Sequence, residues 1–120
     1  MSAKILTVDD AIYMRAMLKK ILDSQGYQIV EAGDGAAGVA AYQAEKPDLV
    51  LMDITMPGMD GITATRQIVQ SDPAAKVVIC SALGQQAMVL EAVKAGASEY
   101  VVKPFEPDQV IEVVQRVLAA

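Results

Sequence analysis

Polar side chains with catalytic potential follow four short, strand-like apolar runs of this chain. In chain order they are Asp9, Asp10, Asp53, Ser81 and Lys103. If the runs are parallel strands of one sheet, these groups emerge at its carboxyl edge, where open α/β sheets bind ligands. Three carboxylates, a hydroxyl and an ammonium would then share one shallow pocket, a set that suits a divalent cation and a phosphoryl group.

The three carboxylates predict a magnesium site. Mg²⁺ takes octahedral oxygen coordination, usually one or two carboxylates together with waters. Asp9 and Asp10 are adjacent and cannot both point the same way, so one ligates directly and the other through water, while Asp53 supplies a second direct carboxylate. Close carboxylates repel one another and raise the pKa of at least one of them, a penalty that a bound cation and Lys103 remove.

Helix capping is a plainer interpretation of one of these residues. Asp is common at the N-cap after a strand, and we expect Asp10 to serve partly as the cap of a helix that begins near Ala11. Capping does not explain the whole set, because a second Asp, a Ser and a Lys-Pro pair stand at three further strand ends.

The elements that must position these groups alternate along the chain. Apolar runs of four or five residues alternate with longer amphipathic segments, which is typical of βαβ units and a parallel sheet. The predicted strands are 4–8, 28–32, 49–52, 76–80 and 99–102, and the predicted helices are 11–25, 35–45, a segment from the turn 56–61 to about 71, 85–95 and 107–118. Right-handed crossovers place helices on both faces, giving a three-layer α/β sandwich.

Two of the predicted helices carry clear apolar stripes at helical spacing. The expected inner stripes are Met14, Met17, Leu18, Ile21 and Leu22 in the first helix, and Val110, Val113, Val114, Val117 and Leu118 in the last. Chain reversal between the first and third strands would open a crevice beside Asp9, Asp10 and Asp53.

Length and composition limit the possible functions of the chain. The 120 residues fit one domain, 1–120, and the 53% hydrophobic content is ample for a core. The net charge of −5 and the absence of a basic stripe argue against direct nucleic-acid binding. No apolar stretch approaches the ~20 residues of a membrane span, and the start has no signal-peptide pattern, so we expect a cytoplasmic protein.

The counts of histidine and cysteine also limit the possible chemistry. The chain has no histidine, so any phosphohistidine in its chemistry must belong to a partner. Its one cysteine, Cys80, cannot form an internal disulfide and lies in an apolar run, where we expect it to be a small buried hydrophobe.

Four motifs resemble those of response-regulator receiver domains in order and in spacing. They are Leu6–Asp10, Met52–Gly61, Cys80–Ala82 and Val102–Phe105. The resemblance covers essentially the whole chain and implies a doubly wound (βα)5 fold, flavodoxin-like, with strand order 2-1-3-4-5. Within the family, the stretches Asp53–Pro57 and Cys80–Gln86 are most similar to the single-domain chemotaxis regulators, and the chain ends after the fifth helix, so we expect no attached output domain.

The resemblance implies roles for the polar cluster. Asp53 would be the phosphoacceptor, taking a phosphoryl group from the phosphohistidine of a sensor histidine kinase (CheA-like). Asp10, Asp53 and the backbone carbonyl of Thr55 would ligate Mg²⁺ directly, and Asp9 would act through a coordinated water. Lys103 would neutralise the phosphoryl group together with the metal. The protein would be a signalling switch that catalyses only its own phosphorylation and dephosphorylation.

The family resemblance also implies a conformational switch. The Ser81 hydroxyl would bond a phosphoryl oxygen, the Tyr100 ring would turn inward, and the surface around Val89 and Val102 would change for a partner. Lys103–Pro104 would be a cis peptide that aims the ammonium into the site. The expected partners are the kinase, a flagellar motor switch protein and a phosphatase, and the expected state is a monomer.

Three other functions stay open at this point. The chain could be a phosphorelay intermediate, or the receiver of a transcriptional regulator. It could be an aspartyl-phosphate phosphatase, although that chemistry needs a second acid where Thr55 stands. A nucleotide- or flavin-binding module of similar architecture would need a glycine-rich loop after the first strand, which this sequence lacks.

Overall fold

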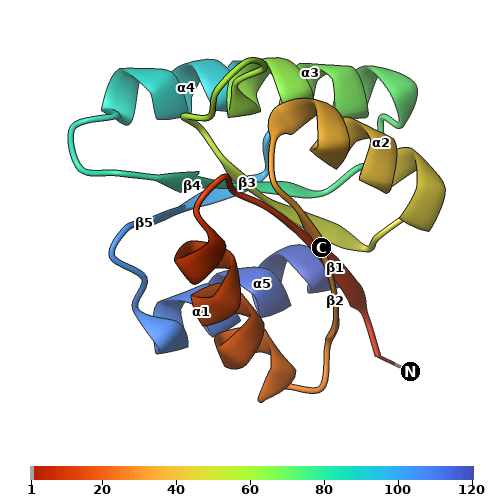
Figure 1. The fold of residues 1–120 in the computed structure, drawn as a ribbon, viewed down its shortest axis with the longest axis vertical. Helices are drawn as coiled ribbons and strands as arrows, with labels where there is room; N and C mark the ends of the chain where they lie inside the picture. Colours follow the sequence, from red (N-terminus) through yellow and green to blue (C-terminus); the bar gives the residue numbers. More distant parts are fainter. Residues whose placement is uncertain (1) are drawn as a thin grey trace.

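A parallel sheet forms the middle layer of the protein, whose computed structural model describes residues 2–120. The strands are β1 (Lys4–Val8), β2 (Gln28–Ala32), β3 (Leu49–Asp53), β4 (Val77–Ser81) and β5 (Glu99–Val102). Their order is β2-β1-β3-β4-β5, which confirms the predicted topology and places β3 at the centre (Figure 1). The parallel register pairs Val8 with Met52 and Asp53 with Cys80, so the carboxyl ends of these strands lie at one edge.

Helices cover both faces of this sheet. They are α1 (Ile12–Asp23), α2 (Gly35–Glu45), α3 (Gly61–Ser71), α4 (Gln86–Lys94) and α5 (Pro107–Ala119). In Figure 1, α2, α3 and α4 lie above the sheet, and α1 and α5 lie below it. The crossovers between parallel strands therefore build the expected three-layer sandwich.

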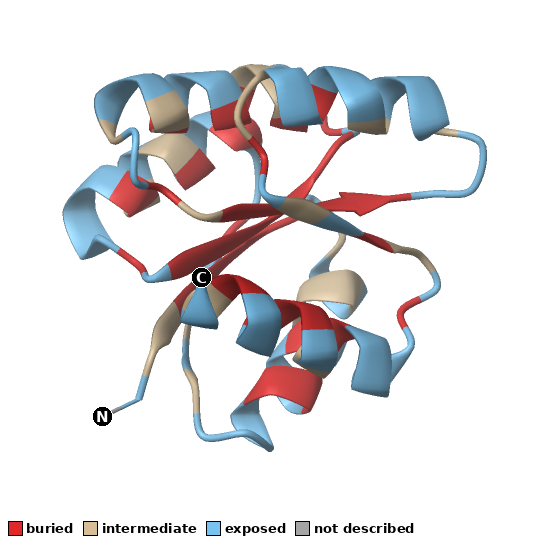
Figure 2. Cartoon of the chain, turned by 180° about the vertical axis from the view of Figure 1, so that it is seen from behind, coloured by how far each residue is buried: buried red, intermediate tan, exposed pale blue. Residues whose placement is uncertain are grey.

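The sheet divides the core into two apolar layers. Alternate residues of a strand point to opposite faces, so Leu6 and Val8 pack under α2, α3 and α4, whereas Ile5 packs against α1 and α5. Every residue of β3 and β4 is buried (Figure 2). Strands buried on both faces are continuous apolar runs rather than alternating ones, which is how these two strands appear in the sequence.

The first helix departs from its predicted stripe. Leu18, Ile21 and Leu22 are buried as expected, but Met17 is 40% exposed and α1 ends at Asp23 rather than at residue 25. The reason is that α1 shares the layer beneath the sheet with α5 alone among the helices, as Figure 1 shows. The outer margin of the α1 stripe therefore faces solvent. The stripe of α5 is confirmed at its four valines, and Leu118 is half-buried.

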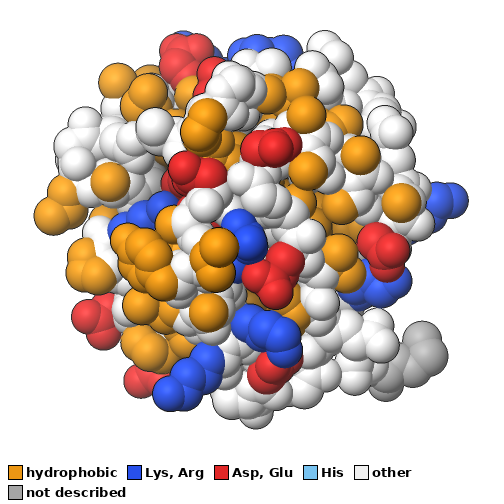
Figure 3. Space-filling model, in the orientation of Figure 1, with side chains coloured by type: hydrophobic (Ala, Val, Ile, Leu, Met, Phe, Trp, Pro, Cys, Tyr) orange, Lys and Arg blue, Asp and Glu red, His pale blue; other side chains and the backbone are white. Residues whose placement is uncertain are grey.

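The outer surface carries charges of both signs. On the face shown in Figure 3, Lys and Arg side chains are interspersed with Asp, Glu and hydrophobic groups rather than gathered in a stripe. Of the helices that the structure describes, none combines the length and the apolar character needed to cross a bilayer.

Gly61 brings the start of α3 against the strand that carries Asp53. Its N–H donates to the Ile54 carbonyl at 2.8 Å, and a Cβ at Gly61 would overlap the Asp53 carbonyl oxygen. Because backbone cannot yield as a side-chain tip can, we expect Gly61→Ala to lower the free energy of unfolding by about 1–3 kcal/mol. Urea denaturation measures this change.

The matched control for that variant is Gly33→Ala. A Cβ at Gly33 would meet only the Arg15 side chain, at an ordinary 3.6 Å. Equal unfolding midpoints for Gly61→Ala and Gly33→Ala would show that the close approach of Gly61 to Asp53 does not affect the free energy of unfolding.

Candidate functional site

The three predicted carboxylates meet at the carboxyl edge of the sheet. One oxygen from each of Asp9, Asp10 and Asp53 lies within 4.8 Å of the others. Asp9 follows β1 and Asp53 ends the adjacent β3, so the parallel register itself brings them together. Asp9 and Asp53 are buried, while Asp10 is exposed at the rim. The sequence prediction that these groups share one site is confirmed.

Lys103 enters the cluster from the loop after β5. Its Nζ donates to Asp9 Oδ2 at 3.1 Å and to Asp53 Oδ1 at 2.9 Å. The backbone supports this reach, because the Lys103 N–H donates to the Ser81 carbonyl at 2.7 Å. The Lys103–Pro104 peptide is cis, as expected. One ammonium against three carboxylates leaves two negative charges in excess, which is the charge of a divalent cation with opposite sign.

Burial and charge shift the pKa values of this pair. Burial raises the pKa of Asp53, and the negative charges of Asp9 and Asp10 add to the effect, while Lys103 opposes it. For Lys103, burial disfavours the ammonium, yet hydrogen bonds and charges from Asp53 and Asp9 outweigh it and raise the pKa. The ammonium is therefore firmly charged, and the Asp53 carboxylate gains from any further cation placed beside it.

The two adjacent aspartates have different roles from those that capping predicts. Asp9 Oδ1, not Asp10, accepts from the Ala11 N–H at 2.9 Å, and α1 begins at Ile12 with Ala11 at its N-cap and no side-chain cap. The interpretation of Asp10 as a cap is therefore wrong. The physical reason is the short Asx turn, in which a carboxylate bonds the backbone two residues ahead.

That turn leaves Asp10 uncommitted. Asp9 has both carboxylate oxygens engaged, one by Ala11 and the other by Lys103. Within residues 2–120, by contrast, no hydrogen bond reaches the Asp10 carboxylate, Asp53 Oδ2 or the Thr55 carbonyl. The free oxygens thus belong to the three groups that the family resemblance assigns as direct metal ligands.

Ser81 accepts a backbone hydrogen bond from Lys103 and lines an apolar cavity. Its side chain is buried, and its Oγ lies 3.5 Å from the Val101 carbonyl, at the outer limit of a hydrogen bond. The cavity, about 310 Å³ in volume, opens between α4 and β5. Its lining includes Ser81, Leu83, Val89, Leu90, Tyr100 and Val102. Tyr100 is 49% exposed at this cavity.

Two residues at the site were not predicted from the sequence. Arg15 donates from Nη1 to the Asp9 carbonyl and from Nε to Glu31 at 3.0 Å, which ties the first strand-end loop to β2. Gln85 bonds Thr55 and the backbone of Ala82. Gln85 lies in a stretch that carries the family resemblance, but no spacing in the sequence tells where its side chain points.

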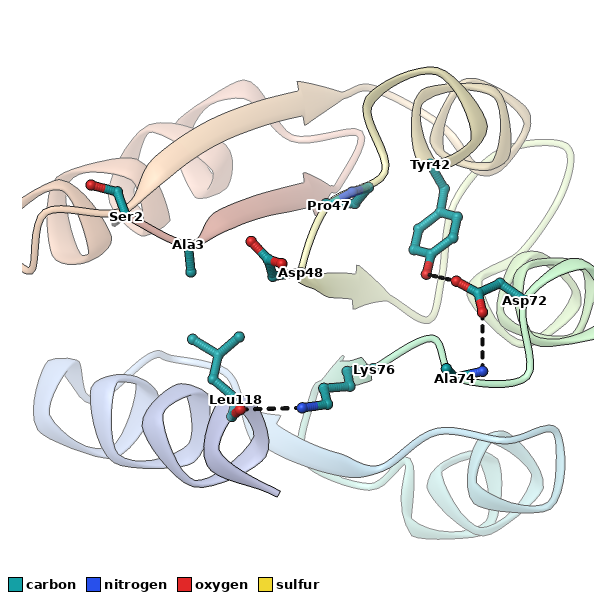
Figure 4. A pocket seen from close by; sticks show the side chains of 9 residues that line it. All are labelled: Ser2, Ala3, Tyr42, Pro47, Asp48, Asp72, Ala74, Lys76 and Leu118. Atoms are coloured by element: carbon teal, nitrogen blue, oxygen red, sulfur yellow. Dashed lines mark hydrogen bonds between the residues drawn. The ribbon is translucent and has the colours of Figure 1, made fainter.

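A larger cavity lies at the opposite end of the sheet. It measures about 520 Å³ and is lined by residues that include Tyr42, Asp48, Asp72 and Lys76 (Figure 4). Its polar groups bond one another or the backbone: Tyr42 donates to Asp72 at 2.7 Å, and Lys76 donates to the Leu118 carbonyl at 3.1 Å. We assign the site to the acidic cluster, whose oxygens are not satisfied in this way.

Comparisons with known proteins agree with this assignment. Residues 5–115 match the model of the response regulator receiver domain. The chain is 52% identical to the chemotaxis protein CheY of Thermotoga maritima, covering 98% of each chain. It is 51% identical to CheY of Bacillus subtilis, covering 98% of this chain and 99% of that one.

A solved structure also resembles it. In the CheX-CheY-BeF3-Mg²⁺ complex from Borrelia burgdorferi, a chain with 36% identity superimposes with a TM-score of 0.91, covering 96% of this chain and 88% of that one. The family model spans most of the sequence, and both curated relatives are matched over nearly their full length. The chain therefore belongs to the family of response regulator receiver domains.

Proposed function

We propose that this protein is a phosphorylation-activated response regulator of chemotaxis, and that Asp53 accepts the phosphoryl group. The observation that carries the proposal is Asp53 itself, a buried carboxylate at the end of the central strand, with one oxygen held by Lys103 and two further carboxylates beside it. The CheY proteins at about half identity support the chemotaxis role.

The donor set of the cluster fits Mg²⁺. Carboxylate and carbonyl oxygens are the ligands that this ion takes, and the uncommitted ones belong to Asp10, Asp53 and Thr55. We assign these three as direct ligands and Asp9, whose oxygens are already engaged, as the residue that acts through water. When bound, the ion supplies neutralisation of the anionic phosphoryl oxygens.

The transfer is a nucleophilic substitution at phosphorus. A carboxylate oxygen of Asp53 attacks, a P–O bond forms as the P–N bond to the donor imidazole breaks, and the imidazole keeps the electron pair. Lys103, already directed at Asp53, stabilises the charge on the phosphoryl oxygens. The histidine belongs to the kinase, because this chain has none. Water later cleaves the same P–O bond and restores Asp53, so the protein catalyses only these two steps on itself.

We assign the partner surface to the α4–β5 face. Leu90 and Tyr100 are exposed there, beside the cavity that Ser81 also lines. The expected partners are a CheA-like kinase, a flagellar motor switch protein and a phosphatase, and the Borrelia complex of CheX with CheY supports a protein partner of the phosphorylated form. We propose that residues 1–120 act as one receiver domain, as a monomer and in the cytoplasm.

Magnesium dependence tests the proposal. Acetyl phosphate should add one phosphoryl group to the protein when Mg²⁺ is present, and chelation with EDTA should stop the reaction. Asp10→Asn should weaken Mg²⁺ binding about tenfold, because a neutral amide replaces a ligand whose charge no other group compensates. Isothermal titration of Mg²⁺ and mass spectrometry of the labelled protein measure the two effects.

The matched control is Glu91→Gln, which removes one carboxylate charge at an exposed position on α4. It should leave both measurements unchanged. Equal Mg²⁺ affinities for wild type and Asp10→Asn would rule out the site. Steady turnover of a phosphate monoester would instead favour an aspartyl-phosphate phosphatase.

A further inference from the structure

One glutamine side chain joins the two loops on either side of the proposed phosphorylation site. Gln85 Oε1 accepts from the Ala82 N–H at 2.7 Å, and Gln85 Nε2 donates to Thr55 Oγ1 at 2.9 Å. Ala82 directly follows Ser81, and Thr55 comes two residues after Asp53. The bridge therefore connects the peptide beside the proposed switch residue with the loop beside the proposed nucleophile.

The local backbone explains why Gln85 can make this bridge. Residues 82–85 form a tight turn in which the Gln85 N–H donates to the Ala82 carbonyl at 3.3 Å. Gly84, the third residue of this turn, adopts φ +88°, a left-handed conformation that glycine adopts without steric cost. The turn folds Gln85 back over Ala82 just before α4 begins at Gln86.

The bridge is well formed where the neighbouring contact of Ser81 is weak. The Ser81 hydroxyl lies 3.5 Å from its acceptor, whereas both Gln85 bonds are shorter than 3 Å. If Ser81 and the peptide that follows it shift together toward a phosphoryl group on Asp53, the Ala82 N–H leaves Gln85 Oε1. A contact made in one state and lost in the other biases the equilibrium toward the first.

We propose that the Gln85 side chain is a latch that holds the resting arrangement of Ser81 and Ala82 against Thr55 and so opposes switching. This inference rests on the proposed function of Asp53 and Ser81. Gln85 is a positioning residue, since it acts through the two loops rather than on the phosphoryl group. Removal of the Gln85 side chain should therefore shift the equilibrium toward the activated conformation. Removal of a contact that stabilises the activated conformation would have the opposite effect.

Beryllofluoride, with Mg²⁺, is the probe, because it mimics a phosphoryl group on a carboxylate. Gln85→Met keeps the length of the side chain and removes both hydrogen bonds. We expect the half-saturating beryllofluoride concentration to fall about fivefold, since binding no longer has to break the latch. Thr55→Val removes one of the two bonds and should lower it by a smaller factor. The double variant should match Gln85→Met, because the two residues share one bridge.

The control is Gln67→Met, the same change at an exposed position on α3, which should bind beryllofluoride as the wild type does. Unchanged or weaker binding by Gln85→Met would overturn the latch. A second measurement needs no phosphoryl mimic: the Ala82 amide should exchange with solvent faster in Gln85→Met than in Gln67→Met. Equal exchange rates would also overturn the latch. Failure of the wild type to bind beryllofluoride would refute the function proposed for Asp53, and the Ala82 exchange rates would still decide the latch.

Discussion

Asp53→Asn should abolish phosphorylation of this protein by acetyl phosphate or by a phosphorylated kinase. An amide is neutral and a poor nucleophile, so the acyl phosphate cannot form. The substitution keeps the shape of the side chain at a buried position, and Lys103 retains its bond to Asp9. The measurement is labelling that survives acid and is lost in base, the behaviour of an acyl phosphate.

Asp60→Asn is the matched control for this experiment. Asp60 caps α3 by accepting from the Thr63 N–H at 2.8 Å, and asparagine caps helices equally well. This variant makes the same chemical change a few residues away and should be labelled as the wild type is. Labelling of Asp53→Asn at the wild-type rate would show that the nucleophile is another residue.

Ser81→Ala should still allow phosphorylation but should weaken the gain in partner affinity that follows from it. The variant keeps Asp53 and Lys103, so it should still accept a phosphoryl group. It loses the hydroxyl that we expect to bond a phosphoryl oxygen, a charge-assisted hydrogen bond of about 1.5–3 kcal/mol. The gain in partner affinity on adding beryllofluoride should therefore shrink by about tenfold to a hundredfold. Binding to a flagellar motor switch protein with and without beryllofluoride measures this gain.

Ser98→Ala gives the comparison, because Ser98 is exposed at the opposite end of the sheet. It should keep the full gain in affinity. If Ser81→Ala also kept it, Ser81 would have no part in coupling the site to the partner surface, even if the chemistry at Asp53 stood.

The strand ends and their chemistry could be predicted from the sequence. Continuous apolar runs indicated β3 and β4, and parallel strands share one carboxyl edge, so Asp9, Asp53 and Lys103 had to converge. The convergence is confirmed by the bonds from Lys103 to both carboxylates. What made these residues predictable is that backbone topology alone fixes their position.

The remaining details depend on side-chain direction and tertiary contact. Which of Asp9 and Asp10 bonds the start of α1 is set by an Asx turn, and residue type alone favoured the wrong one. Met17 fits the stripe of α1 by spacing, but its burial depends on how many helices share that face. The bridge from Gln85 to Thr55 spans thirty residues of sequence and leaves no periodic signal.

The most direct test of the phosphorylation switch is a nuclear magnetic resonance titration of the labelled wild-type protein with beryllofluoride and Mg²⁺. We expect resonance shifts at Asp53 and Ser81 together with shifts at Val89, Tyr100 and Val102, because Ser81 lines the same cavity as these last three residues. Asp53→Asn should show neither set. Shifts confined to the acidic cluster, with the α4–β5 face unchanged, would contradict a phosphorylation switch.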